Sequence, residues 1–173
     1  MTLEELKEKL PSSAKDTKLN LGIVLSEEGA PDLNIKQIAG VALASAYTTK
    51  NADLIATITE FSANILSEQE QESAKAAATI MAMNNVYYRF THLVEDEEIV
   101  KLPAKLRMNI IANPGIAKTD FELICMAVSA INGCGMCMKS HLHEIAKGGL
   151  SKLAAQSAIR IASVINATAQ ALV

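Results

Sequence analysis

The 173-residue sequence has no tryptophan, and three tyrosines and three phenylalanines are its only aromatic residues. Half of the residues are nevertheless apolar, mostly Ala, Ile, Leu, Val and Met. Small aliphatic side chains of this kind let helices approach closely, so this composition favours a helical core. No apolar run reaches the roughly 18 residues that a membrane-spanning helix needs. We therefore expect no membrane span.

The sequence also lacks a run of basic residues, and its formal net charge is −3. Neither nucleic acid nor an anionic membrane is an expected partner of such a chain. The first seven residues are amphipathic and charged, unlike the apolar core of a signal peptide, which predicts a cytoplasmic protein. Three cysteines are too few for a disulfide framework. In a reducing compartment a Cys-x-x-Cys pair is instead expected to be catalytic or metal-binding.

No segment shows sustained alternation of apolar and polar residues, which predicts an all-α protein of about eight to ten helices without a sheet. Capping boxes at Thr2/Glu5 and Ser67/Glu70 mark two of the helix starts. The acidic residues 95–98 fit a solvated loop or a helix start. The expected helices cover residues 2–10, 13–26, 34–49, 52–65, 67–93, 101–111, a stretch from 119 that carries Glu122, 136–147 and 151–172.

Residues 37–46 can be laid over residues 122–131, and each stretch is followed by a polar turn, a helix and a longer helix. This pattern favours an internal duplication of a helical unit. Two unrelated Ala-rich helices could also produce it. We expect one domain, residues 1–173, in which the N-terminal half (about 1–100) has no active site and the C-terminal half (about 101–173) carries the chemistry.

Residues 122–141 hold the reactive side chains. Cys134 and Cys137 form a Cys-x-x-Cys pair, His141 follows four residues later, and Glu122 precedes the pair by twelve residues. A helix from Met136 to Lys147 would place Cys137 in its first turn, where free N–H groups and the helix dipole favour a thiolate. His141 would then lie one turn further along, on the same face as Cys137.

Three explanations of the Cys-x-x-Cys pair compete: dithiol redox catalysis, half of a zinc site, or coincidence. A structural zinc site needs four ligands, whereas Cys134, Cys137 and His141 supply three and no second Cys/His pair exists. Making a thiolate dominant at neutral pH takes roughly 2–3 kcal/mol. A helix N-terminus supplies about 0.3–1 kcal/mol, so a further group such as His141 is needed. Redox chemistry is favoured, with no cofactor and no metal.

Glu122 has two interpretations that the spacing does not separate. It can accept a proton, directly or through His141, or it can complete a capping box with Thr119. His141 could likewise be a polar surface residue. Cys125 lies inside an apolar helix and is expected to be a small buried hydrophobe.

The pattern of Glu122, Cys134, Cys137 and His141 resembles the signature of the AhpD alkyl hydroperoxidase family, within the wider carboxymuconolactone-decarboxylase-like group. Residues 83–93 and 164–172 are also similar to that family, so the likeness covers nearly the whole chain. Two positions depart from the pattern: Met136 stands where some members carry a histidine, and Leu142 stands where an acidic residue is frequent.

The resemblance implies an all-helical homotrimer that reduces organic hydroperoxides and regenerates the peroxiredoxin AhpC, with electrons from a dihydrolipoyl-bearing protein. It also implies that Cys137 becomes the sulfenic acid, that Cys134 is the proton donor and resolving thiol, and that Glu122 and His141 relay protons. The alternative is a dithiol redox sensor or binding protein without peroxidase turnover. A decarboxylase-like enzyme of the wider group is less consistent with the dithiol, which that chemistry does not need.

Overall fold

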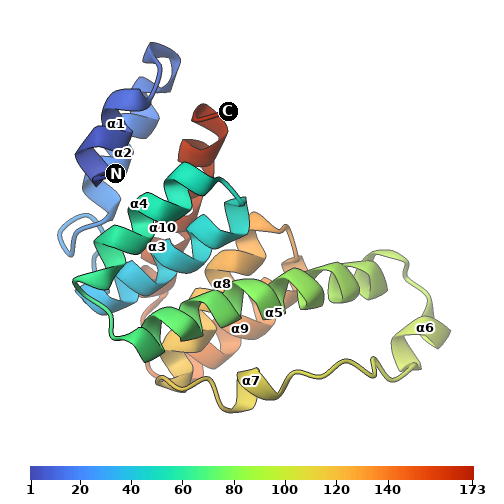
Figure 1. Ribbon diagram of the computed structural model, residues 1–173. Helices are drawn as coiled ribbons and strands as arrows, with labels where there is room; N and C mark the ends of the chain where they lie inside the picture. Colours follow the sequence, from blue (N-terminus) through green and yellow to red (C-terminus); the bar gives the residue numbers. More distant parts are fainter.

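The computed structural model describes residues 1–173 and contains helices but no strand, as expected (Figure 1). None of the helices combines the length and apolar character that crossing a bilayer requires. The elements are α1 (Leu3–Lys9), the 3-10 helix η1 (Ser12–Ala14), α2 (Lys15–Val24), α3 (Ile35–Thr49), α4 (Ala52–Ala63), α5 (Glu68–Leu93), α6 (Glu97–Lys101), α7 (Asn109–Ala112), α8 (Lys118–Ile131), α9 (Gly135–Lys147) and α10 (Lys152–Ala171).

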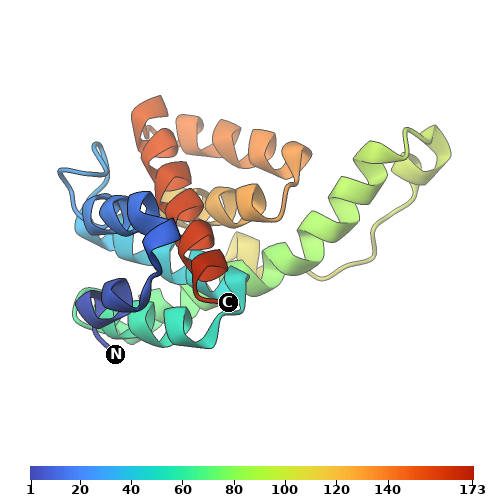
Figure 2. The ribbon, with the colours of Figure 1, turned by 90° about the horizontal axis from the view of Figure 1, so that it is seen from above.

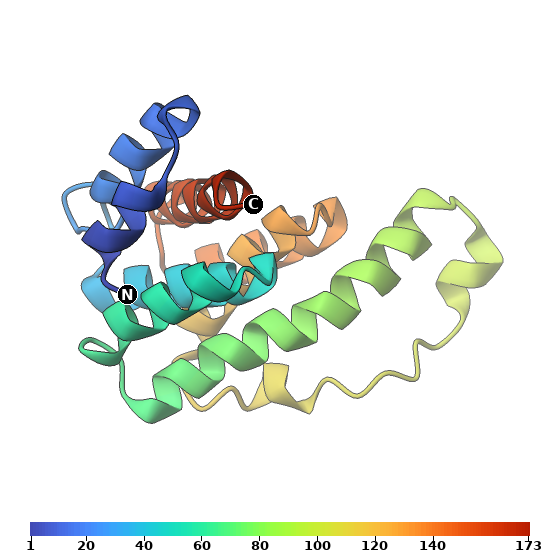
Figure 3. The ribbon, with the colours of Figure 1, turned by 45° about the horizontal axis from the view of Figure 1, so that its top comes forward.

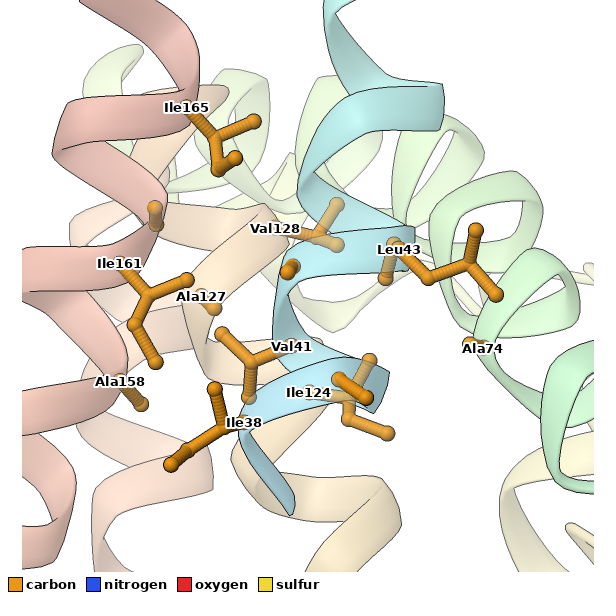
Figure 4. Packing of buried hydrophobic residues seen from close by; sticks show 14 of the residues in the cluster. Ile38, Val41, Leu43, Ala74, Ile124, Ala127, Val128, Ala158, Ile161 and Ile165 are labelled. Carbon is orange, nitrogen blue, oxygen red and sulfur yellow. The ribbon is translucent and has the colours of Figure 1, made fainter. Parts of the chain in front are cut away.

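Helix α3 lies at the centre of the core and packs against α4, α5, α8 and α10. Its residues 38–46 are all buried, and six of these nine are alanine, serine or glycine. At Gly40 an added Cβ would lie 3.1 Å from Ile124, so α3 and α8 approach closely at this position. Figure 4 shows the contact of these helices. The labelled core residues are Ile38, Val41, Leu43, Ala74, Ile124, Ala127, Val128, Ala158, Ile161 and Ile165.

The packing of the two halves follows one pattern. Helix α3 packs on α4 and α5, and α8 packs on α9 and α10. The helices α3 and α8 also pack on each other, while α5 contacts α8 and α10 contacts α3. Two copies of one helical unit would produce such reciprocal contacts. The duplication of residues 37–46 and 122–131 stays a prediction that this arrangement favours.

The C-terminal part of α5 projects from the body of the molecule and carries α6 at its tip (Figures 1 and 2). The chain then returns in extended form past α7 toward α8, which Figure 3 shows most clearly. This projection, residues 86–102, is called the arm below. Large apolar side chains are exposed along it: Val86, Phe90, Leu93, Val94, Val100 and Leu102.

Most expected helix starts are confirmed. Both capping boxes form, at Thr2/Glu5 and at Ser67/Glu70, and Asn34 caps α3. Asp96 accepts hydrogen bonds from two backbone N–H groups and starts α6, so the acidic cluster is a helix start. The predicted helix over 13–26 is shorter, because η1 precedes α2 and α2 ends at Val24.

The predicted helix over 101–111 is wrong. Residues 102–108 are irregular, and only the single turn α7 follows. Leu102 has an extended backbone with a ψ of 135°, because the ring of Pro103 disfavours the helical conformation of its predecessor. Lys105 has a φ of 51°, which a right-handed helix cannot include. Residues 102–108 therefore form an extended return segment.

Candidate active site

The turn between α8 and α9 brings the two cysteines together. Gly133 has a φ of 71°, a left-handed conformation that glycine adopts without strain, and Cys134 caps α9. Helix α9 begins at Gly135, one residue before the predicted start at Met136, and ends at Lys147 as expected. Cys134 and Cys137 form a disulfide with their Cα atoms 5.3 Å apart. The Cys-x-x-Cys pair therefore occupies the first turn of α9.

The two sulfur atoms differ in their surroundings. Cys134 is fully buried, whereas Cys137 is 7% exposed and lines a pocket. The backbone N–H of Cys137 donates a hydrogen bond to Sγ of Cys134 at 3.3 Å. A free N–H at a helix N-terminus stabilises negative charge on its acceptor. A reagent in the pocket therefore reaches Cys137, while the helix terminus favours the departure of Cys134 as a thiolate.

Glu122 and His141 form a buried pair that joins α8 to α9. The distance from Nδ1 of His141 to Oε2 of Glu122 is 2.6 Å, and the two residues are 8% and 4% exposed. An ionised carboxylate only accepts hydrogen bonds, so Nδ1 carries the proton in this contact when Glu122 is charged. The Glu122 carboxylate thereby fixes the orientation of the imidazole ring.

The capping-box interpretation of Glu122 is wrong. Ala117 is the N-cap of α8 and no side chain caps that helix, so Thr119 already lies within the first turn. Glu122 points to the protein interior instead, because its partner is His141 on the neighbouring helix. The alternative of a surface position for His141 is also excluded by its burial.

The other ring nitrogen of His141 meets a sulfur atom from a distant part of the chain. Its Nε2 lies 3.3 Å from Sδ of Met81 on α5, a fully buried residue. A thioether is a weak hydrogen-bond acceptor, so Nε2 can exchange a proton with the pocket and gives up only a weak contact with Met81 when it does so. The hydroxyl of Ser129 contacts the same sulfur of Met81 and accepts a hydrogen bond from the Asn85 side chain. The Asn85 oxygen in turn accepts a hydrogen bond from Asn132. These contacts hold the thioether in place.

The pocket beside Cys137 has a volume of about 270 Å³. One wall comes from α5, α7 and the return segment and is apolar except for Asn84 and the hydroxyl of Tyr88. The other wall carries the carboxylates and the imidazole of α8 and α9. Its lining residues are Met81, Asn84, Tyr88, Met108, Ile111, Glu122, Met136, Cys137, Ser140, His141 and Glu144. Three of the four predicted site residues thus face one cavity, and Cys134 lies behind Cys137.

Sequence reasoning missed Asn84 and the role of Met81. Both residues lie on the face of α5 that meets the pocket, since 81, 84 and 88 follow helical spacing. A polar residue on an otherwise apolar helix face is the signal that could have indicated Asn84. Nothing in the sequence indicates that this face meets His141, because the contact spans 60 residues.

The third cysteine is not part of this site. Cys125 is buried in α8, and burial raises the pKa of its thiol well above the usual value, with the charge of Glu122 acting in the same direction. A thiol with a raised pKa stays protonated and is a poor nucleophile. The prediction that Cys125 is a small buried hydrophobe is confirmed.

Known proteins resemble this chain over nearly its whole length. The model of the carboxymuconolactone decarboxylase family matches residues 97–173. A protein of Coxiella burnetii (strain RSA 493 / Nine Mile phase I) named alkyl hydroperoxide reductase AhpD is 56% identical over 168 residues, which cover 97% of this chain and 95% of that protein. Proteins of the same name from Gluconacetobacter diazotrophicus and Methylocella silvestris are 48% and 44% identical, each over 99% of this chain and over 93% and 95% of their own.

This chain belongs to the AhpD family. Its two departures from the expected AhpD pattern lie at the edge of the site. Met136 is partly exposed and lines the pocket, where it adds apolar surface in place of a second imidazole. Leu142 is exposed on α9 and lies outside the pocket. In this AhpD protein His141 and Glu122 are therefore the only imidazole and the only buried carboxylate that line the pocket with Cys137.

Proposed function

We propose that this AhpD protein is a thiol-dependent alkyl hydroperoxide reductase that cycles between the Cys134/Cys137 dithiol and its disulfide. The observation that carries the proposal is the position of Cys137. Its sulfur borders a pocket together with a buried imidazole–carboxylate pair and is bonded to a second cysteine behind it. A nucleophile, a proton relay and a resolving thiol are the groups that this reaction needs.

In the oxidising half-reaction, the Cys137 thiolate attacks the distal oxygen of the hydroperoxide. The O–O bond breaks, an S–O bond forms, and the alkoxide takes a proton to leave as the alcohol. We assign this proton to the His141–Glu122 pair, whose Nε2 is the nitrogen that can exchange a proton with the pocket. Cys137 is then a sulfenic acid.

In the second step, the Cys134 sulfur attacks Sγ of Cys137. The S–O bond breaks, the disulfide forms, and hydroxide leaves as water with the proton of the Cys134 thiol. The two residues are in position for this step, since the disulfide is accommodated within the first turn of α9. A sulfenic acid is therefore resolved before a second peroxide can oxidise it further.

A dithiol donor then returns the site to its reduced state. Its thiolate attacks Sγ of Cys137, which borders the pocket, and Cys134 departs as a thiolate. The N–H of Cys137, which donates to Cys134 Sγ at 3.3 Å, stabilises that leaving group. The second thiol of the donor opens the mixed disulfide and carries away both electrons as its own disulfide.

The pocket supports an organic hydroperoxide as the substrate class. Six of its eleven lining residues are hydrophobic, among them Met108, Ile111 and Met136. An alkyl or aryl group buries apolar surface there, at about 25 cal/mol per Å², which hydrogen peroxide cannot do. Charged groups are confined to the side of the pocket where the peroxide bond would lie.

The partners are proposed on the same basis as the reaction. The sulfur of Cys137, which borders the pocket, suits exchange with a dihydrolipoyl-bearing protein, and the reduced dithiol could pass electrons on to the peroxiredoxin AhpC through a mixed disulfide. Such reductants belong to a reducing compartment, which supports a cytoplasmic location. The exposed apolar side chains along the arm favour packing of the arm on neighbouring copies, and the number of three copies is what the family resemblance implies.

The decisive experiment combines steady-state turnover with mass spectrometry. Cumene hydroperoxide and dihydrolipoamide are supplied, and the consumption of peroxide is followed for wild type, Cys137→Ser and Cys134→Ser, with Cys125→Ser as the control. Cys137→Ser should consume none. Cys134→Ser should accumulate a sulfenic acid on Cys137, trapped with dimedone. A redox sensor would oxidise once and stop, and sustained turnover by Cys137→Ser would show that the assignment is wrong.

A further inference from the structure

Asn84 is a buried polar residue whose carboxamide has no partner for its oxygen. It is 4% exposed, its Oδ1 is enclosed without any hydrogen bond, and it lines the pocket beside Cys137. Its neighbour on α5 differs in this respect. Asn85 donates to Ser129 at 2.9 Å and accepts from Asn132 at 2.9 Å, so both ends of its amide are used.

A buried amide oxygen without a partner destabilises the folded protein, and nearly all such groups in native structures find one. Asn85 shows how this protein satisfies an asparagine whose role is structural. Asn84 is placed on the same helix, one residue away, and lines the cavity beside Cys137. Of the buried side-chain atoms without a partner, this oxygen belongs to the residue that lines the pocket, so a group bound in the pocket can supply what it lacks.

The position of Asn84 relative to the reactive groups limits what that group can be. Asn84 lies one helical turn after Met81, on the same face of α5, and Met81 contacts the imidazole of His141. Cys137 lines the same pocket from α9. A ligand that reaches Cys137 is thus flanked by His141 on one side and by the Asn84 amide on the α5 side.

We propose that the carboxamide of Asn84 binds the hydroperoxide group of the substrate; this inference rests on the proposed function. A hydroperoxide offers one O–H donor, on its distal oxygen, and acceptors on both oxygens. Asn84 offers an acceptor, Oδ1, and a donor, Nδ2–H, on one rigid plane. When the carboxamide turns toward the bound substrate, the otherwise enclosed Oδ1 accepts from the distal O–H, and Nδ2–H donates to the proximal oxygen.

This contact is stronger in the transition state than in the bound substrate. As the O–O bond breaks, negative charge develops on the proximal oxygen, and a hydrogen bond to a charged acceptor is roughly twice as strong as one to a neutral acceptor. Asn84 therefore orients the distal oxygen toward Cys137 and stabilises the departing alkoxide until it is protonated. Asn84 does not act in the reduction of the disulfide, where no hydroperoxide is present.

The test separates the two half-reactions of Asn84→Leu, Asn84→Ser and wild type. Leucine removes both hydrogen-bonding groups at similar volume, and serine keeps one hydroxyl. The control is Thr79→Val, an exposed position on α5 outside this pocket. Single-turnover oxidation of the reduced protein by cumene hydroperoxide is followed by alkylation and mass spectrometry, and reduction of the disulfide by dihydrolipoamide is timed separately.

For Asn84→Leu we expect oxidation to slow by about tenfold or more, which corresponds to ~1.4 kcal/mol, with the reduction rate within about twofold of wild type. Its melting temperature should be equal to or above that of wild type, because an unpartnered polar group has been removed. Asn84→Ser should be oxidised faster than Asn84→Leu, and Thr79→Val should be oxidised at the wild-type rate.

Three results would overturn the inference. An unchanged oxidation rate in Asn84→Leu would show that the amide does not touch the substrate. An equal loss in both half-reactions, or a lowered melting temperature, would show a structural role. Oxidation of Asn84→Leu could be slowed equally with apolar and with fully polar peroxides, while Asn84→Ser recovers none of the oxidation rate. That result would show that the amide binds a water molecule in the pocket rather than the substrate. If wild type itself consumed no hydroperoxide, the proposed function would fall first, whereas an active wild type with an equally active Asn84→Leu contradicts only this inference.

Discussion

Substitution of Glu122 by glutamine tests the proton relay with little change of shape. In the structure the Glu122 carboxylate accepts from Nδ1 of His141 at 2.6 Å, and the pair is buried between α8 and α9. The glutamine oxygen can still accept from Nδ1–H, so the ring keeps its orientation. Glutamine cannot take up a proton, so the pair loses its capacity as a base.

The effect on stability is expected to be small. A hydrogen bond to a charged group contributes about 1.5–3 kcal/mol and a neutral one about 0.5–1.5, so Glu122→Gln should lower the free energy of unfolding by about 1 kcal/mol. For a protein of this size that is a fall in melting temperature of about 2–4 °C. Glu122→Leu leaves Nδ1 of His141 buried without an acceptor and should lower the free energy of unfolding by about 1–3 kcal/mol.

The effect on the chemistry is expected to be much larger. Loss of a positioned acid–base group slows a reaction by about 10²- to 10⁴-fold, and we expect the oxidation of Cys137 by cumene hydroperoxide to slow within this range in Glu122→Gln. Rapid mixing with acid quench, followed by alkylation of the remaining thiols, measures this rate. Asp120→Asn, on the same helix and outside the pocket, is the matched control.

The reasoning is refuted if Glu122→Gln forms the disulfide at the wild-type rate. The buried pair would then serve only to join α8 and α9. A slower oxidation that is accompanied by a large loss of unfolding free energy would lead to the same conclusion. The reasoning expects a large fall in the oxidation rate with only a small fall in stability.

Three further substitutions test the core, the ion pairs and the arm. Phe121→Ala empties a fully buried site and should lower the free energy of unfolding by about 3–5 kcal/mol in urea titrations; a loss below about 1 kcal/mol would contradict the burial. The hydrogen bond from Lys36 lowers the pKa of Glu70, so its carboxylate stabilises the fold above its ordinary pKa of 4.5 and this contribution is lost as the pH falls through the lowered value. The stability difference between wild type and Glu70→Gln should therefore shrink below about pH 4 in thermal melts, and a constant difference would exclude the linkage. On the arm, Phe90→Glu should reduce the molar mass measured by light scattering to that of a smaller species, whereas an unchanged mass would place the subunit contact elsewhere.

The elements that sequence predicted well depend on neighbours within a few residues. Thr2 with Glu5 and Ser67 with Glu70 form their capping boxes because each pair satisfies backbone N–H groups one turn away. The Cys-x-x-Cys pair likewise lies in a helix start because glycine permits the turn just before Cys134. The failed prediction, the helix over 101–111, placed Pro103 in the first turn of that helix, whereas the proline ring keeps Leu102 extended and no helix continues there.

By itself the sequence determined the all-α class, most helix boundaries and the four candidate side chains, since periodicity, caps and motif spacing are local properties. Only the tertiary structure decided that Glu122 pairs with His141 rather than capping α8, that Met81 contacts the imidazole, and that Asn84 faces the pocket without a partner. The physical reason is distance along the chain. These contacts join α5, α8 and α9, and they form because burial of the apolar faces of α3, α8 and α10 sets how the helices meet.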